Sequence, residues 1–439
     1  MIEILPVGGM DEIGRNMTAI GFDGEYVIVD MGVRLDSILA LEDVDIGRMS
    51  RRELININAI PDDAILHGKN VKGIFFTHGH LDHIGAVGKL AYEYRAPLYG
   101  TPYTMQVLKE VLREESCQVP PKKDFHRVDP GATVETGDIT VEFIPVTHSI
   151  PHTSLLLVRR REETVLVASD FKLDENPLLG HRTDVRRLRG LSGDGLKAAL
   201  VGCVRLNEVG PTPSEARARE MLREVMGEAC DGSGMVFITT FSSHIARLKS
   251  IVELSLELGR RPVMVGRSLK NYCSAAIDLG LVKFPEELKI YGRPNSARTI
   301  LKKLEKERRE TVIICTGHQG EPTSVLSRIA DGKLSPAIQP GDSVVFSASV
   351  IPNPINQANR QMLEVKLEAQ GAIIYRDVHV SGHAGKTDTK EFLRMVNPEN
   401  IIPCHGTPER LEAMVEISRD LGYSEQNIHR LKNWELWRG

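Results

Sequence analysis

The sequence His-Gly-His-Leu-Asp-His at residues 78–83 is the feature that most restricts how this chain can fold. It follows the apolar run 71–77, which predicts a buried strand, and precedes the small-residue run 84–88. Three imidazoles and one carboxylate in six positions have no packing rationale, but they can converge on a turn between a strand and a helix. Neutral imidazole and carboxylate are the ligands that zinc prefers where cysteine is absent. The segment therefore predicts a metal site at the end of a buried strand.

Three further side chains stand at the ends of other predicted strands. His148, Asp170 and His405 each follow directly after an apolar run. A lone histidine at a strand end usually has a structural role, and four ligands in one turn can hold one metal but not two. A two-metal site needs additional ligands of this kind. Together with the histidine-rich turn, the three residues therefore favour a dinuclear centre.

The middle of the chain has a different pattern of predicted strands and helices from its two ends. From about residue 197 to residue 348, apolar strands alternate with amphipathic helices, which is typical of βαβ units and a parallel sheet. The length of 439 residues also exceeds one ordinary core, since domains hold roughly 150 residues. We therefore expect a domain in two parts, residues 1–196 and 351–439, with a second domain at 197–350.

Composition excludes several classes of protein. The net charge of −4 excludes a globally basic nucleic-acid binder, although a locally basic groove remains open. No run approaches the roughly 18 apolar residues of a membrane span, and the first residues lack the pattern of a signal peptide. The six cysteines are scattered, without a C-x-x-C pair, as in a reducing compartment. We therefore expect a cytoplasmic protein with no membrane partner.

The order of the candidate ligands resembles that of the metallo-β-lactamase fold. The long stretch between Asp170 and His405 holds the alternating strands and helices, and an insertion at this place resembles the β-CASP nucleases. The resemblance implies an α/β protein, a metallo-β-lactamase αββα sandwich with an inserted β-CASP α/β domain built on a parallel sheet. It also implies two Zn²⁺ ions per chain, bridged by Asp170. One ion would be held by His78, His80 and His148, and the other by Asp82, His83 and His405.

Within that group the chain resembles ribonuclease J over nearly its whole length. Its length, ending at Gly439, is similar to the short archaeal form, and we expect the additional C-terminal domain of many bacterial relatives to be absent. The segments that carry the resemblance are residues 8–16, 169–174, 239–248, 266–268, 316–322, 379–384 and 403–406.

This resemblance implies a zinc-dependent ribonuclease. We expect it to degrade single-stranded RNA from 5′ to 3′, to prefer 5′-monophosphate ends and to cut internally as a second mode. Asp82 would hold or deprotonate the attacking water, and His383 would protonate the departing 3′ oxygen. A homodimer and an RNA-processing assembly are the expected partners. The residues implied to contact RNA phosphates are Ser242, Ser243, Arg267, His379, Ser381, Gly382 and His383.

Gly202 is a departure from the family pattern. β-CASP nucleases usually carry an acid after the strand that here covers residues 198–201, where this chain has Gly202 and Cys203. We expect Gly202→Asp to raise the cleavage rate if the acid is missing, and to lower it if Glu208 fills that role. Two other interpretations stay open. In the first, the chain is a catalytically weakened RNA-binding subunit of an RNA-processing assembly. In the second, it is another metallo-β-lactamase-fold hydrolase that acts on a thioester or a lactam.

Overall fold

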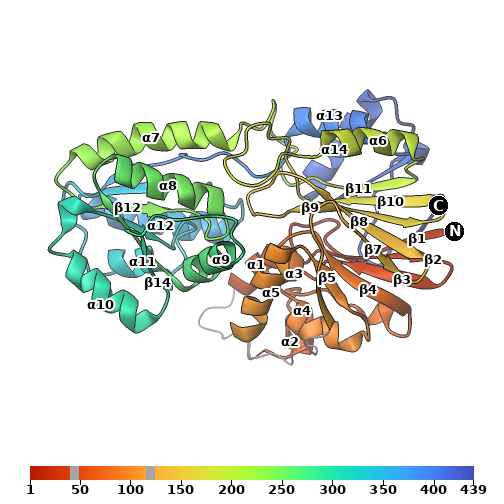
Figure 1. Cartoon of the computed structure of the whole chain (residues 1–439), viewed down its shortest axis with the longest axis horizontal. Helices are drawn as coiled ribbons and strands as arrows, with labels where there is room; N and C mark the ends of the chain where they lie inside the picture. The colour runs from red at the N-terminus through yellow and green to blue at the C-terminus, as the bar shows by residue number, and fades with distance from the viewer. Residues whose placement is uncertain (40–48, 115–123) are drawn as a thin grey trace. The chain divides into compact units, whose positions relative to one another are not determined.

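The computed structural model describes residues 1–39, 49–114 and 124–439, which divide into two compact units (Figure 1). The first unit comprises Met1–Glu175, Gly180–Thr212 and Gly382–Gly439, and the second comprises Asn176–Leu179 and Pro213–Ser381. The first unit is therefore built from both ends of the chain, and nearly all of the second is inserted between them.

These limits differ from the boundaries expected at residues 197 and 350. Strand β11 (Ala198–Gly202) pairs in parallel with β10 (Glu163–Ala168) and β18 (Asn400–Cys404), so it belongs to the first unit. The second unit continues past residue 350, because β17 (Ile373–Tyr375) extends its parallel sheet beside β16 (Ser343–Phe346).

The first unit contains two sheets that pack face to face. Phe75, Phe143 and Leu200 contribute to the core between them, and Leu188, Phe392 and Met414 pack outside the second sheet. The first sheet has the order β19 (Trp437–Arg438), β1 (Ile2–Gly8), β2 (Met17–Phe22), β3 (Glu25–Val29), β4 (Asn70–Phe76), β5 (Leu98–Gly100) and β6 (Phe125–Arg127). The second has the order β18, β11, β10, β9 (Ser154–Arg160), β8 (Ile139–Pro145) and β7 (Thr133–Thr136).

Helices cover the outer faces of both sheets in the first unit, as Figure 1 shows. Those beside the first sheet are α1 (Leu35–Leu39), α2 (Arg51–Asn56), α3 (Leu81–Ile84), α4 (Val87–Leu90) and α5 (Pro102–Glu114). Those beside the second sheet are α6 (Val185–Gly190), α13 (Lys386–Val396) and α14 (Pro408–Asp420). The unit is thus an αββα sandwich.

The second unit is a parallel sheet covered by helices, as the alternating sequence pattern predicts. Leu301, Leu326 and Leu363 come from three of these helices and pack into its hydrophobic core. The strand order is β14 (Lys289–Tyr291), β13 (Arg261–Val265), β15 (Thr311–Cys315), β12 (Val236–Thr239), β16 and β17. The helices are α7 (Glu215–Asp231), α8 (Ile245–Glu257), α9 (Arg267–Asp278), α10 (Pro294–Leu304), α11 (Val325–Ala330) and α12 (Pro354–Ala369).

The described part of the chain contains no helix that is both long and apolar enough to cross a membrane.

Five cysteines in the described residues are free thiols, and four of these are buried. Cys117, the sixth, lies outside the described residues.

The direction of the strands brings the candidate ligands to one edge of the sandwich. Strands β10, β11 and β18 are parallel, and β8 runs in the same direction because β9 is antiparallel to both β8 and β10. The carboxyl ends of these strands therefore meet at one edge, where His148, Asp170 and His405 follow β8, β10 and β18.

Candidate metal centre

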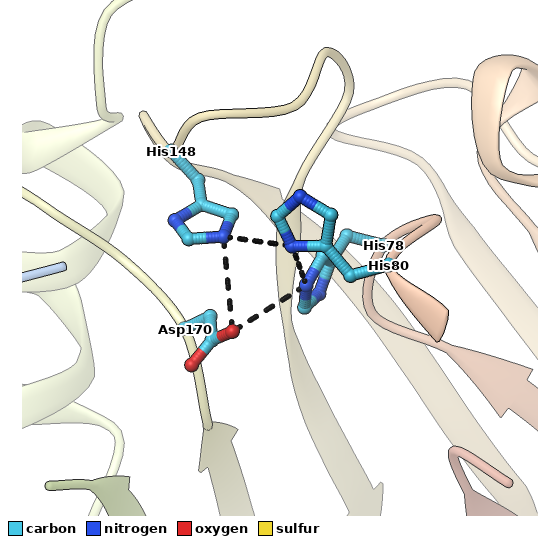
Figure 2. Close-up of side chains that lie close together, drawn as sticks. All are labelled: His78, His80, His148 and Asp170. Carbon is cyan, nitrogen blue, oxygen red and sulfur yellow. Dashed lines mark hydrogen bonds and ion pairs between the residues drawn. The ribbon is translucent and has the colours of Figure 1, made fainter. Parts of the chain in front are cut away.

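The structure brings the seven candidate ligands together in two groups that share Asp170. Within each group the ligand atoms lie within 4.8 Å of one another. Figure 2 shows the first group, in which three imidazoles and one carboxylate point toward one another from the ends of different strands. The first group is His78, His80, His148 and Asp170, and the second is Asp82, His83, Asp170 and His405.

The first group is tightly packed. His78 Nε2 and His148 Nε2 lie 3.0 and 3.2 Å from His80 Nδ1. Asp170 Oδ2 lies 3.4 Å from His78 Nε2 and 3.7 Å from His148 Nε2. The side chains of His78, His148 and Asp170 are almost fully buried, so these nitrogen and oxygen atoms are shielded from bulk solvent.

The outer contacts of two of these histidines fix which nitrogen carries the proton. The Thr77 hydroxyl donates to the Asp30 carboxylate, so its contact of 3.0 Å with His78 Nδ1 requires that nitrogen to be the donor. His148 Nδ1 donates in the same way to the carbonyl oxygen of Gly382 at 2.6 Å. The Nε2 atoms of both rings therefore face the cluster with free lone pairs.

The second group contacts both oxygens of Asp170. His405 Nε2 lies 3.5 Å from Asp170 Oδ1 and 3.4 Å from Asp82 Oδ2. His83 Nε2 lies 3.3 Å from Asp170 Oδ2 and 3.6 Å from Asp82 Oδ2. Asp82 is the most exposed ligand of this group, with 23% of its side chain accessible, so this side of the centre opens toward solvent.

Asp30 supports this second group, although sequence reasoning did not single it out as a functional residue. It follows β3, and its carboxylate accepts from His83 Nδ1 at 2.8 Å and from the backbone N–H of Thr77 at 2.9 Å. A carboxylate behind a ligating histidine fixes the ring and its tautomer. The available signal was an acid at a strand end, the same pattern that identified Asp170.

The electrostatic environment lowers the pKa of some of these histidines and raises that of another. Burial lowers the pKa of His80 to about 4, and burial also lowers the pKa values of His78 and His148 well below the usual range. Burial acts in the same direction on His83, but the Asp82 and Asp30 carboxylates outweigh it and raise its pKa. The first group therefore presents neutral imidazoles at pH 7, which is the form that binds a metal.

These side chains fit a cation. The Nε2 lone pairs of His78 and His148 converge on His80 Nδ1 at hydrogen-bonding distance, an arrangement that a positive ion between the three rings would stabilise. Asp170 Oδ1 is buried and has no hydrogen-bond partner within the described structure, and a buried carboxylate oxygen in that state needs a compensating charge. Nitrogen and oxygen donors without sulfur suit a divalent ion such as zinc.

His383, the expected proton donor, lies beside the first group. Its Nε2 is 3.6 Å from Asp170 Oδ2, and its ring centroid is 4.9 Å from that of His148. The ring is partly exposed, with 29% of the side chain accessible. The structure therefore places a partly exposed imidazole next to the candidate metal ligands.

The other residues expected to contact RNA lie in the second unit, except Gly382. Ser242 and Ser243 follow β12, and the Ser242 hydroxyl lies 2.9 Å from that of Ser268. Arg267 is exposed at the start of α9, while His379 and Ser381 follow β17. These residues gather after the carboxyl ends of parallel strands, where α/β sheets commonly bind ligands.

The structure leaves no room for a side chain at position 202 without a shift of the neighbouring backbone. Gly202 ends β11, and a Cβ atom there would lie 1.6 Å from the carbonyl oxygen of Ser169, the residue before Asp170. This clash argues against the expectation that Gly202→Asp raises the cleavage rate, because any side chain must displace the segment that carries a candidate ligand. Glu208, the other candidate acid, forms an ion pair with Arg205.

Three segments of the chain match known protein families. Residues 10–220 match the metallo-beta-lactamase superfamily, and residues 233–364 match the beta-CASP domain of ribonuclease J. Residues 374–427 match the Zn-dependent metallo-hydrolase RNA specificity domain. These matches confirm the expected fold, and the fold with its ligand groups indicates a divalent metal cofactor.

Individual relatives cover almost the whole chain. Ribonuclease J of Methanocaldococcus jannaschii is 43% identical, over 98% of this chain and 97% of its own length. Ribonuclease J of Pyrococcus abyssi is 43% identical, over 96% and 94%, and that of Sinorhizobium meliloti is 32% identical, over 99% and 73%. A crystal structure of a protein of unknown function from Enterococcus faecalis V583 shares the fold, with a TM-score of 0.67 at 16% identity over 99% of each chain. The chain belongs to the ribonuclease J family.

Proposed function

We propose that this protein is a metal-dependent ribonuclease that degrades single-stranded RNA from 5′ to 3′. The observation that carries the proposal is the pair of four-residue ligand groups joined by Asp170, in a chain that is 43% identical to two archaeal ribonuclease J proteins. Family membership makes RNA the substrate, and the ligand groups supply the means of hydrolysis.

Two zinc ions per chain are the cofactor that we infer. His78, His80 and His148 would hold one, Asp82, His83 and His405 would hold the other, and Asp170 would bridge them. When bound, such ions lower the pKa of coordinated water toward about 7 and neutralise charge that develops on the phosphoryl oxygens. The donor set of imidazoles and carboxylates supports zinc.

Two side chains of the protein carry out the proton transfers in this proposal. Asp82, the most exposed ligand of the second group, orients the attacking water or accepts its proton. His383 lies next to Asp170 on the other group and donates a proton to the departing 3′ oxygen. The products are a 5′-phosphate on the downstream fragment and a 3′-hydroxyl on the upstream fragment.

The second unit and the turn at Gly382 supply phosphate contacts in this proposal. The set is Ser242, Ser243, Arg267, His379, Ser381, Gly382 and His383. Hydroxyls, backbone N–H groups and one guanidinium recognise phosphate oxygens. A pocket that fits one terminal phosphate holds a triphosphate poorly, so RNA with a 5′-monophosphate is the preferred substrate. The proposal also includes internal cutting as a second mode of cleavage. It further includes a homodimer, association with an RNA-processing assembly and a cytoplasmic location.

A second function is favoured by one observation, the absence of an acid at Gly202 and of room for one. In that case the protein is a catalytically weakened RNA-binding subunit. The complete ligand set argues for the enzyme, and measured cleavage separates the two.

The test uses one RNA labelled at either end, with 5′-hydroxyl, monophosphate and triphosphate versions. Early release of nucleotides from the 5′ end, fastest for the monophosphate, supports the proposal. His80→Ala removes a ligand and should abolish cleavage together with metal binding, whereas His181→Ala, an exposed histidine of the same unit, should change neither. Binding of RNA without cleavage at full metal occupancy would favour the second function, and a His80→Ala protein with full activity would remove the metal site from the mechanism.

A further inference from the structure

We propose that Thr212 is a positioning residue for His383, and that its hydroxyl holds the turn 383–385 in the orientation that cleavage requires. The inference rests on the proposed function, in which His383 protonates the leaving oxygen. Thr212, His383 and every residue that connects them lie in the first unit.

The Thr212 side chain is the centre of three hydrogen bonds. Its hydroxyl donates to the carbonyl oxygen of His383 at 2.9 Å and accepts from the backbone N–H of Gly385 at 3.0 Å. Arg205 Nη1 donates to the same hydroxyl at 2.9 Å. A hydroxyl has one donor and two acceptor lone pairs, so these contacts use its whole hydrogen-bonding capacity.

Thr212 is itself held in place by the helix that follows the turn. Its backbone N–H donates to Asp388 Oδ2 at 2.8 Å, and Asp388 lies in the first turn of α13. Both residues are buried, with 6% and 5% of their surface exposed. Neither partner can exchange this contact for water, so Thr212 links the turn rigidly to the start of the helix.

The neighbours of His383 in the chain are tied to the ligand segments. The Gly382 carbonyl oxygen accepts from His148 Nδ1, and the Ala384 N–H donates to the carbonyl oxygen of Phe171 at 2.7 Å. Phe171 follows Asp170 directly. With Thr212 on the carbonyl of His383 itself, three consecutive residues are fixed by separate hydrogen bonds, and these fix the turn relative to both ligand groups.

This main-chain support matters more in a chain with glycine at position 202. The Ser169 carbonyl oxygen occupies the space that a Cβ atom of residue 202 would need, so no side chain at that position can orient the His383 imidazole. The direction of the ring then depends on the backbone from which it projects. The Thr212 hydroxyl holds that backbone through hydrogen bonds to the His383 carbonyl oxygen and the Gly385 N–H.

The expected consequence lies in the step that uses the proton. The P–O3′ bond breaks as the water oxygen bonds to phosphorus, and His383 delivers its proton to O3′, which leaves as a hydroxyl. A positioned general acid contributes about 10²–10⁴-fold, and a displacement of about 1 Å can remove roughly 10²-fold. Loss of the Thr212 hydroxyl should therefore slow the single-turnover rate at saturating RNA by about 10- to 100-fold.

The experiment compares Thr212→Val, which keeps the shape but lacks the hydroxyl, with Thr212→Ser, which keeps the hydroxyl. Thr164→Val is the matched control, because Thr164 is a buried threonine whose hydroxyl donates to the Gly195 carbonyl oxygen at 3.1 Å, at the end of β10 away from Asp170. Each protein is measured on ordinary RNA and on RNA whose scissile O3′ is replaced by sulfur. A thiolate leaves without protonation, so only the ordinary substrate needs the general acid.

We expect Thr212→Val to be slow on ordinary RNA and close to the parent on the sulfur-linked RNA, with unchanged metal content and RNA affinity. Thr212→Ser and Thr164→Val should match the parent on both substrates. If Thr212→Val does not fold, Thr212→Ala, which leaves room for water to satisfy the stranded groups, is measured in the same way.

Two results would overturn the inference. One is a parental rate of Thr212→Val on ordinary RNA, and the other is an equal loss on both substrates, which would mark a structural role only. Failure of the proposed function is recognised separately: the parent then does not cleave, or His383→Ala cleaves ordinary RNA at the parental rate.

Discussion

Asp30 lies outside the candidate ligand set but contacts one of its histidines directly. Its carboxylate accepts from His83 Nδ1, which leaves His83 Nε2 directed at Asp82 and Asp170. The residue has a left-handed backbone with φ of 62°, a conformation that aspartate and asparagine adopt more readily than most residues. A test of its role can therefore change the charge without straining the backbone.

Asp30→Asn should weaken metal binding by about 10- to 100-fold, which is the usual effect of removing the partner of a ligating histidine. Competition with a chelator measures the affinity. Asp138→Asn, which alters an exposed acid paired with Arg160, should leave the affinity unchanged. Equal affinities for Asp30→Asn and the parent would show that the carboxylate does not support the ligand.

Gly202→Ala should reduce both thermal stability and metal content. Its Cβ atom would lie 1.6 Å from the carbonyl oxygen of Ser169, and relief of that clash moves Asp170 away from the other ligands. Gly193→Ala is the control, because a Cβ atom there has no neighbour within 4 Å. Thermal unfolding and metal analysis check both variants, and a Gly202→Ala protein with full stability and metal content would contradict the packing argument.

The sequence identified the residues of the two candidate ligand groups more readily than the residues that hold them in place. His78, His148 and Asp170 stand at strand ends and are polar in apolar surroundings, so the local pattern reveals them. Thr212 and Asp388 have ordinary local surroundings, and their roles depend on contacts with residues far away in the chain. Such contacts leave no periodic signal.

At the scale of elements, strand β11 shows where pattern reasoning reaches its limit. The apolar run at residues 198–201 correctly predicted a strand, but the alternation that follows it suggested that the strand belongs to the inserted domain. The structure pairs it instead with β10 and β18. An apolar run indicates that a strand is buried, but the identity of its neighbours depends on pairings across the whole chain.

Helices α7 and α8 of the second unit are joined by a buried ion pair that should govern the stability of that unit. The Arg247 side chain is fully buried and donates to both carboxylate oxygens of Glu215, at 2.6 and 2.8 Å. It also donates to the carbonyl oxygen and hydroxyl of Ser347, which follows β16. This single guanidinium therefore connects two helices and the sheet.

Arg247→Met should destabilise the second unit by about 3–5 kcal/mol, because it removes the guanidinium that pairs with the buried Glu215 carboxylate. Arg223→Met, which removes an exposed pair with Glu257, should change stability by about 0–1 kcal/mol. Hydrogen exchange of the β12 amides, recorded at increasing urea concentration, measures the free energy of unfolding of this unit. Similar effects of the two substitutions would show that burial does not strengthen the pair.

At the scale of the whole molecule, metal binding should stabilise the two units unequally. All seven candidate ligands lie in the first unit. A ligand at 100 times its Kd stabilises the state that binds it by about 2.7 kcal/mol. Zinc should therefore slow hydrogen exchange in β10 strongly and in β12 weakly, and a chelator should reverse the change. His80→Ala should lose the response. Equal protection of both strands by zinc in the parent, or unchanged protection of β10 in His80→Ala, would contradict the assignment.

The separation of the ligands along the chain has a consequence for synthesis. His78 to Asp170 leave the ribosome early, but His405 follows only after the entire second unit has been made. At about 5–20 residues per second, that interval is on the order of tens of seconds. Throughout it the nascent chain remains attached to a messenger RNA while its metal centre lacks one ligand. The topology thus delays the completion of the candidate metal centre until the whole second unit has been translated.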